Sequence, residues 1–95
     1  MSKVIESAIA ALNDKNVSFE DGMAKFVIKG EGAIMVDVNG ARAGNEEADV
    51  TVTADQEVFE GLLNGSVNPT AAFMMGKLSI EGNMTLAMKL GSALV

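Results

Sequence analysis

Apolar residues recur along the chain with two different periods, and the change of period separates helices from strands. At residues 3–13 the apolar side chains follow the spacing of an amphipathic helix, for which Ser2 is a candidate cap. Apolar and polar residues then alternate at 23–30, 33–38 and 48–54, which predicts three strands, the first two of them paired as a hairpin.

The alternation also predicts which side of each strand faces the core. Successive side chains of a strand point to opposite faces of the sheet. We therefore expect Phe26 and Ile28 to point inward from the first strand, and Ile34, Val36 and Val38 from the second. The polar residues between them should face solvent.

Capping residues mark the elements of the second half. Asp55 can cap one helix, Asn68 followed by Pro69 is typical of the start of another, and Asn83 can begin the last. The predicted elements are helices at 56–64, 70–75 and 84–95 and a strand at 77–82. Strands grouped first and helices later indicate an α+β fold with a mainly antiparallel sheet.

The last predicted helix is apolar around most of its circumference. One stripe contains Met84, Ala87, Met88, Gly91 and Val95, and a second contains Leu86, Leu90, Ala93 and Leu94. A helix at a protein surface normally has a polar half, but Lys89 is the only charged residue here. This helix therefore needs cover on two sides, which the two preceding helices, a ligand or a second subunit could supply.

Composition and charge narrow the class of protein. The chain has 95 residues, enough for a single domain at 1–95 with one core. Its net charge of −6 argues against a nucleic acid as partner. The charge is uneven, because residues 31–60 hold eight acids and one base, whereas 61–95 hold only Lys77, Glu81 and Lys89.

Catalytic and metal-binding equipment is sparse. The chain contains no cysteine and no histidine, which excludes disulfides, thiol chemistry and imidazole acid–base catalysis. No nucleophile motif such as Gly-x-Ser-x-Gly is present. Glu46, Glu47 and Asp49 are close in sequence but do not match a calcium-binding loop, so we interpret them as a solvated loop. We expect no enzyme activity, no cofactor and no metal.

The two ends of the chain carry no targeting signal that we recognise. Glu6 interrupts the apolar stretch at the start, which is typical of a helix and not of a signal peptide. The final residues match no retention, peroxisomal or lipidation signal. We therefore expect a cytoplasmic protein.

Four of the seven methionines lie within 15 residues of one another, at Met74, Met75, Met84 and Met88. Methionine is flexible and adapts to apolar partners of different shapes. Each of these side chains could belong to an ordinary core. Together with the doubly apolar helix, they favour a lined apolar cavity that accepts varied apolar guests.

The second half of the chain resembles the sterol carrier protein-2 domain family. The resemblance covers residues 48–90 without a gap. Its motifs are Ala48-Asp49, a helix with Phe59, Leu62 and Leu63, Asn68-Pro69, Phe73, Gly76-Lys77-Leu78, Gly82, Asn83-Met84 and Ala87-Met88-Lys89-Leu90.

The resemblance implies a five-stranded, mostly antiparallel sheet covered by helices around a hydrophobic tunnel. The fifth strand would be a short one at 40–44, which has no propensity signal of its own. The family implies non-enzymatic binding and transfer of fatty acids, fatty acyl-CoA, phospholipids or sterols. The chain ends at Leu94-Val95, without the peroxisomal tripeptide or the longer C-terminal segment of some relatives. This favours a small, bacterial-type member that handles acyl chains.

The candidate lipid-binding residues come from the apolar helices and the strand of this region. They are Phe59, Leu62, Leu63, Phe73, Met74, Leu78, Ile80, Met84, Leu86, Met88 and Leu90. Lys77 and Lys89 are candidate head-group contacts, although both also fit the description of solvated surface lysines.

Two other functions stay open. The chain could be an interaction module whose apolar helix faces form a dimer or dock on a lipid-metabolising enzyme. It could also act on acyl-CoA thioesters, for which the sequence offers no clear nucleophile. For the carrier function we expect a monomer or weak dimer with transient membrane or enzyme contacts.

Overall fold

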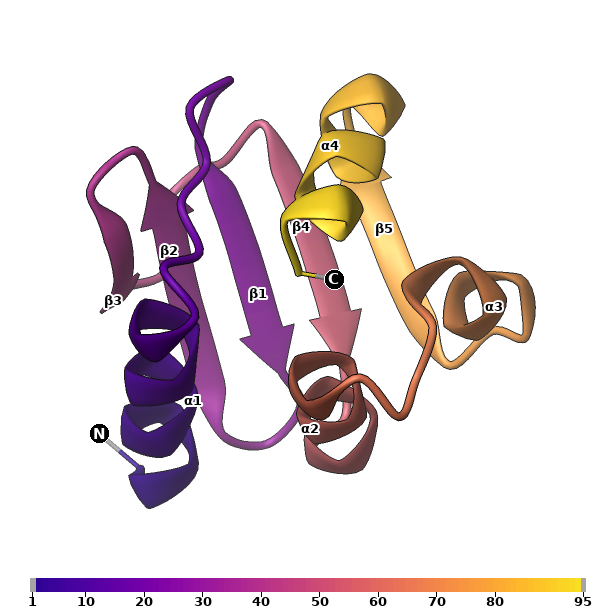
Figure 1. Ribbon diagram of the computed structural model, residues 1–95, viewed down its shortest axis with the longest axis horizontal. Helices are drawn as coiled ribbons and strands as arrows, with labels where there is room; N and C mark the ends of the chain where they lie inside the picture. The colour runs from indigo at the N-terminus through magenta and orange to yellow at the C-terminus, as the bar shows by residue number, and fades with distance from the viewer. Residues whose placement is uncertain (1, 95) are drawn as a thin grey trace.

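The computed structural model describes residues 2–94, with side chains described up to Ser92. Within these residues the chain forms a five-stranded sheet and four helices (Figure 1). In chain order the elements are α1 (Lys3–Asp14), β1 (Ala24–Ile28), β2 (Gly32–Asp37), β3 (Gly40–Ala43), β4 (Val50–Ala54), α2 (Gln56–Asn64), α3 (Pro69–Met74), β5 (Leu78–Gly82) and α4 (Met84–Leu94).

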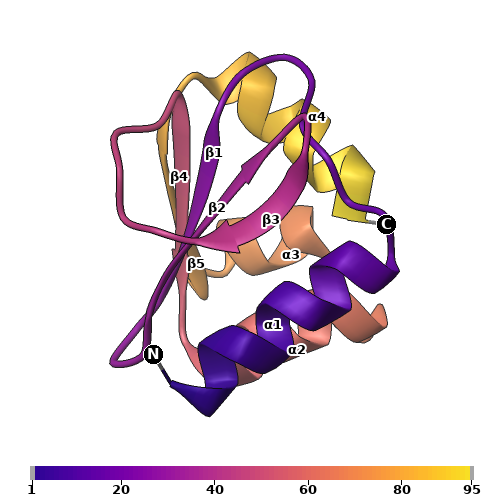
Figure 2. The same ribbon diagram turned by 90° about the vertical axis from the view of Figure 1, so that its left-hand side faces the viewer.

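The strands lie in the order β3-β2-β1-β4-β5. The central pair, β1 with β4, is parallel, and the other three pairs are antiparallel. All four helices lie on the same side of the sheet (Figure 2). The α+β class and the mostly antiparallel five-stranded sheet are therefore confirmed, including β3, the strand for which the local sequence carried no signal.

The core lies between the sheet and the helices. Phe26 of β1 is in register with Ile34 of β2 and Val52 of β4, and all three are buried. The expectation is wrong for Val38, which is 62% exposed. The reason is that β2 ends at Asp37, and the chain turns toward β3 before Val38 can face the core.

The opposite side of the sheet is partly covered by the loop that leads from β3 to β4. Met35 points to this side and is nevertheless fully buried. The loop backbone passes so close at Gly44 that a Cβ atom there would lie 2.9 Å from Met35 Cγ. Lys25 Nζ donates to Asn45 Oδ1 at 3.0 Å and fixes the loop over the centre of the sheet.

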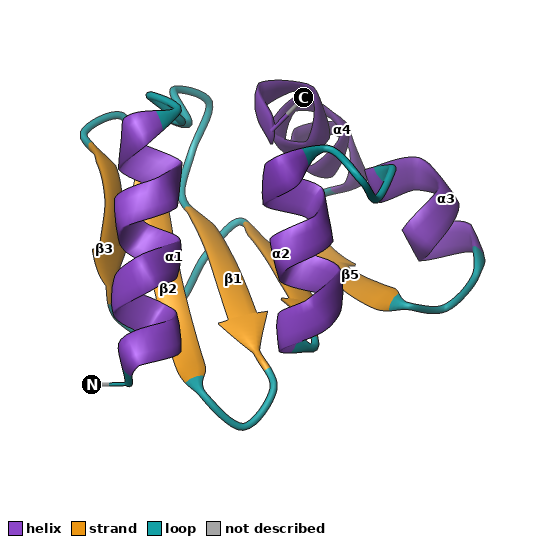
Figure 3. Cartoon of the chain, turned by 60° about the horizontal axis from the view of Figure 1, so that its bottom comes forward, coloured by secondary structure: helices purple, strands orange, loops and turns teal. Residues whose placement is uncertain are grey.

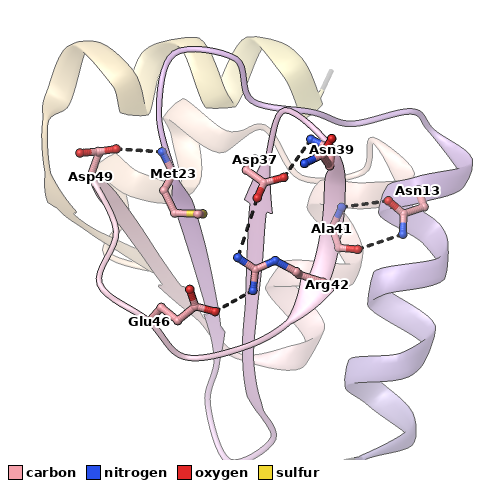
Figure 4. A network of polar contacts seen from close by, with 8 residues as sticks. All are labelled: Asn13, Met23, Asp37, Asn39, Ala41, Arg42, Glu46 and Asp49. Carbon is pink, nitrogen blue, oxygen red and sulfur yellow. Dashed lines mark hydrogen bonds and ion pairs between the residues drawn. The ribbon is translucent and has the colours of Figure 1, made fainter.

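Arg42 holds the start of this loop between two carboxylates (Figure 4). Its Nη1 lies 2.7 Å from Glu46 Oε2, and its Nη2 lies 3.8 Å from Asp37 Oδ2. The hydrogen bond and charge of Arg42 lower the pKa of Glu46, and Glu46 likewise raises the pKa of Arg42. In the part of the chain that the structure describes, no three acids gather in a way that could hold a metal ion.

Asp49 joins three segments that are distant in sequence. Its carboxylate oxygen Oδ2 accepts a hydrogen bond from the backbone N–H of Met23 at 2.8 Å (Figure 4), and its own N–H donates to the Met23 carbonyl, also at 2.8 Å. Its carbonyl accepts from the N–H of Asn83 at 3.0 Å. Gly82 is required beside it, because its φ is +104° and a side chain would collide with the Asp49 carbonyl.

The capping residues inferred from sequence all make their expected contacts. The side-chain oxygens of Ser2, Asp55, Asn68 and Asn83 accept the backbone N–H three residues later at 2.9–3.1 Å. Pro69 occupies the first position of α3, where its missing N–H costs nothing. Local sequence therefore fixes where each helix begins.

Helix α1 closes the edge of the sheet at β3. The Asn13 side chain pairs with the backbone of a single residue of that strand, accepting from the Ala41 N–H at 2.9 Å and donating to the Ala41 carbonyl at 3.1 Å (Figure 4). This pairing satisfies backbone groups that would otherwise be open to another strand.

We predict that Asn13→Ala destabilises the protein by about 1–2 kcal/mol, because two hydrogen bonds to the edge strand are lost. Urea denaturation measures this change. Asn39→Ala is the matched control and should stay within about 0.5 kcal/mol, because Asn39 reaches Asp37 through its backbone N–H at 2.8 Å. Equal stability of the two variants would contradict the role given to Asn13.

Candidate functional site

A cavity of about 460 Å³ lies between the sheet and the helices that pack on it. Figure 3 shows α1 over one half of the sheet and α2, α3 and α4 grouped over the other. The cavity lies within this second group. It is lined by Phe26, Val52, Leu62, Asn68, Pro69, Thr70, Phe73, Leu78, Ile80, Met84, Ala87, Met88, Leu90, Gly91 and Ser92.

The floor of the cavity is a row of side chains across three strands. Phe26, Val52 and Ile80 are consecutive partners in the register of β1, β4 and β5, so they share the face that looks toward the helices. Phe26 is supported from behind by Phe59 of α2, with ring centroids 5.4 Å apart in an edge-to-face arrangement. The floor is thus entirely apolar.

Helix α4 forms one wall with a single stripe of residues. Met84, Ala87, Met88 and Gly91 recur every three or four positions and all line the cavity. Ala87 is buried at the base, whereas Met84 and Met88 are 49% and 75% exposed at the rim. Of the other stripe members expected from sequence, Val95 lies outside the described residues, as do the side chains of Ala93 and Leu94.

The opposite wall comes from the start of α3, where Asn68 and Thr70 are the polar side chains of the lining. The Asn68 side chain accepts from the Ala71 N–H at 3.0 Å. On the α4 side, the Ser92 hydroxyl donates to the Met88 carbonyl at 3.3 Å. The surface left for a guest therefore consists mainly of carbon and sulfur atoms.

Comparison with known proteins assigns the fold to a family. A profile of the SCP-2 sterol transfer family matches residues 3–95. The chain belongs to this family. It is 36% identical over 96 residues to hydroxysteroid dehydrogenase-like protein 2 of Xenopus tropicalis, covering 93% of this chain and 22% of that protein. It is 35% identical to human sterol carrier protein 2 over 98 residues, covering 93% of this chain and 18% of that one.

The chain thus spans about a fifth of the length of the curated relatives that it matches. Solved structures agree on the fold over nearly the whole chain. Sterol carrier protein 2 of Yarrowia lipolytica, in its apo form, superposes with a TM-score of 0.73 at 24% identity, covering 96% of this chain and 86% of that one. Sterol carrier protein 2 like 2 of Aedes aegypti gives 0.70 at 27% identity, with coverages of 94% and 91%.

Seven of the apolar residues proposed from sequence line the cavity of this SCP-2 family chain. They are Leu62, Phe73, Leu78, Ile80, Met84, Met88 and Leu90. The candidates from sequence did not include Phe26, which was expected in the core, or Val52, Ala87 and Gly91. The register of β1, β4 and β5 identifies Phe26 and Val52 as cavity lining, whereas the predicted α4 stripe shared with Met84 and Met88 could have identified Ala87 and Gly91.

The other four apolar candidates lie outside the cavity lining. Phe59 lies one layer behind Phe26. Leu63 lies on the α1 side of α2, in a separate groove. Leu86 points toward the chain before β1, where its Cδ1 lies 3.5 Å from the Cβ position of Gly22. Met74 is 80% exposed at the end of α3.

Neither proposed head-group lysine lines the cavity. Lys89 Nζ lies 3.4 Å from Asp21 Oδ1, and both side chains are about half exposed. Lys77 lies in a different groove between α2 and α3, which it shares with Glu57 and Glu60. Both lysines therefore lie outside the cavity lining, and both have acidic neighbours.

No helix within residues 2–94 is long and apolar enough to cross a membrane.

The depth of each α4 side chain predicts its effect on stability. Leu90→Ala should cost about 2–5 kcal/mol, because Leu90 is 1% exposed and shared between core and cavity. Met88→Ala, on the exposed rim of the same helix, should cost less than about 0.5 kcal/mol. Thermal and urea unfolding of the two variants measure this difference, and similar losses for both would place Met88 in the core instead.

Proposed function

We propose that this chain binds the apolar chain of a lipid in the cavity and carries it without chemical change. The observation that carries the proposal is the mainly apolar surface that three strands and three helices present to one cavity. Each methylene of a guest that leaves water for this surface contributes about 0.8 kcal/mol. Membership of the SCP-2 sterol transfer family supports the same function.

A single acyl chain is the guest that we favour. The cavity of about 460 Å³ lies within the ~300–1,000 Å³ range of small-molecule sites. The same fold holds palmitate in a sterol carrier protein-2 of Aedes aegypti, which superposes with a TM-score of 0.77 at 16% identity over 100% of this chain and 97% of that one. Fatty acids, fatty acyl-CoA and phospholipids each supply such a chain, and a sterol is the bulkier alternative.

Selectivity among acyl chains should be low. On the α4 side the rim is formed by Met84 and Met88, whose unbranched thioethers adapt to guests of different shape. The head group would lie at the mouth in water. A contact between the head group and Lys77 or Lys89 stays a prediction, and it requires Lys89 to leave Asp21.

Transfer without catalysis fits the chemistry of the lining. None of the described residues that line the cavity has an ionisable side chain, so no general acid or base faces the guest there. This weighs against hydrolysis of a thioester in the cavity. The cytoplasmic location, inferred from the sequence, also stays a prediction.

The proposal predicts that the gently purified protein carries lipid. Mass spectrometry of an organic extract should find near-stoichiometric fatty acid or phospholipid, and a fluorescent fatty acid analogue should bind to the delipidated protein. A lipid-free protein that also refuses the analogue would contradict the proposal.

Gly91 offers a variant that fills the cavity without damage to the fold. A Cβ at this position would lie 4.0 Å from Pro69 Cβ, which is ordinary contact, and the branched end of a leucine would extend into the cavity. We predict that Gly91→Leu lowers the affinity for the fatty acid analogue about tenfold or more, equivalent to the contacts of two or three methylenes. Its stability should not fall, because leucine favours a helix over glycine by ~1 kcal/mol.

The matched control is Gly91→Ala, which adds one methyl group and should cause a much smaller loss of affinity. Unfolding curves of both variants show whether the fold is intact. If Gly91→Leu is folded and binds like Gly91→Ala, the guest does not occupy the space between α4 and Pro69.

The alternative function, an interaction module, is favoured by one observation. Met74 and Met75 are 80% and 68% exposed and lie outside the cavity. If these side chains form an interface between copies of the chain, sedimentation should detect a dimer that Met74→Glu/Met75→Glu dissociates. A monomer at all concentrations would exclude that interface.

A further inference from the structure

The side chains of this protein that a peroxide readily oxidises are all of one type. The sequence contains no cysteine, tryptophan, tyrosine or histidine, but it contains seven methionines. A thioether takes up one oxygen atom to become a sulfoxide, which reductases can reverse. Oxidative chemistry on this chain is therefore directed to its methionine sulfur atoms.

The fold places the six methionines of the described residues in four environments. Met23, just before β1, is partly buried and lies apart from the cavity. Met35 is fully buried beneath the β3–β4 loop. Met74 and Met75 are exposed but lie apart from the cavity. Met84 and Met88 are exposed and also line the cavity, one turn apart on α4. Among the methionines that the structure describes, only this last pair combines access for an oxidant with a position in the cavity lining.

We propose that Met84 and Met88 form a modification site at which a hydroperoxide oxidises the thioether and thereby lowers the affinity of the cavity for an apolar chain. This inference rests on the proposed function, because it requires an apolar guest.

The reaction is balanced by its two reactants alone. A lone pair of the methionine sulfur attacks the terminal oxygen of R–O–O–H, the O–O bond breaks and an S–O bond forms. The proton ends on the departing oxygen, so the hydroperoxide is reduced to R–O–H. The sulfur is oxidised by two electrons to the sulfoxide.

The loss of affinity follows from the lining around the pair. A sulfoxide oxygen is a strong hydrogen-bond acceptor, and its burial without a donor is unfavourable. The neighbouring Ser92 hydroxyl already donates to the Met88 carbonyl. Ala87 and Gly91 bring no side-chain donor to the stripe. The remaining side-chain donors of the lining, Asn68 and Thr70, lie on the opposite wall at the start of α3. The oxidised side chain must then turn toward water, which uncovers the guest, or reach across the cavity to that wall, which displaces the guest.

The hydroperoxide can come from two sources that share this chemistry. Hydrogen peroxide in solution reaches every exposed methionine. A fatty acid hydroperoxide that occupies the cavity instead brings its O–O bond to the wall formed by Met84 and Met88. The two sources therefore predict different patterns of oxidation, which the experiment separates.

The first measurement is the affinity for a fluorescent fatty acid analogue before and after limited treatment with hydrogen peroxide. The full chain should lose about tenfold or more on oxidation. For the variant Met84→Leu/Met88→Leu, the ratio of the affinity after peroxide treatment to the affinity before it should stay near one. Met74→Leu/Met75→Leu is the matched control, and its ratio should equal that of the unmodified sequence.

The second measurement locates the added oxygen by mass spectrometry of tryptic peptides. Cleavage after Lys77 and Lys89 isolates residues 78–89, which contain both cavity methionines and no other. Met74 and Met75 lie in the preceding peptide. A fatty acid hydroperoxide should oxidise residues 78–89 several times faster than that peptide, and excess palmitate should suppress the difference. Met35 should stay unmodified while the protein is folded.

The outcomes separate this inference from the proposed function. If the unoxidised protein does not bind the analogue, the proposed function fails and the inference fails with it. If binding occurs but does not change when residues 78–89 are oxidised, only the inference is overturned. If the fatty acid hydroperoxide oxidises both peptides equally, it does not act from within the cavity. Solvent exposure alone then decides which methionines are oxidised, and this part of the inference is overturned.

Discussion

The position of helix α4, and with it the cavity, depends on the hydrogen bonds of Asp49. This residue accepts from Met23 through its carboxylate and from Asn83 through its carbonyl, so it joins the start of β1 and the start of α4 at one end of β4. Because Asn83 also caps α4, the helix leaves this junction in one fixed direction. The acid that the sequence suggests as part of a solvated loop is thus the point from which the wall of the cavity is built.

Helices cover the two halves of the sheet in different ways. Over β2 and β3, helix α1 lies close enough for the Asn13 side chain to form hydrogen bonds with the edge strand. Over β4 and β5, three short helices meet at angles and leave the cavity between them (Figure 3). The acids of α2, Glu57 and Glu60, line a different groove, and no residue of the cavity lining is ionisable. The charged side chains of this half therefore lie apart from the cavity.

Local signals predicted most of the fold, and long-range register decided the rest. Caps such as Asp55 and Asn68 act within one helical turn, so the sequence alone locates them. Strand β3 has almost no intrinsic preference for extended structure, and its pairing with β2 and Asn13 creates it. The same limit applied to the site. Hydrophobicity marks Phe59 and Phe26 alike, and it is the register of β1 with β4 that places Phe26 beside Val52 in the cavity lining.

The cavity couples the stability of this small domain to the binding of a guest. Apolar side chains such as Leu90 and Ala87 gain contacts only on their core side while the cavity is unfilled, and each missing contact lowers the stability of the fold. A domain of 95 residues has little surplus burial to offset such a loss. A guest restores the contacts, and it stabilises the folded state by an amount that grows with its concentration relative to Kd. Flexible methionines at the rim lessen the loss when the guest leaves, because they can fold inward over the apolar floor.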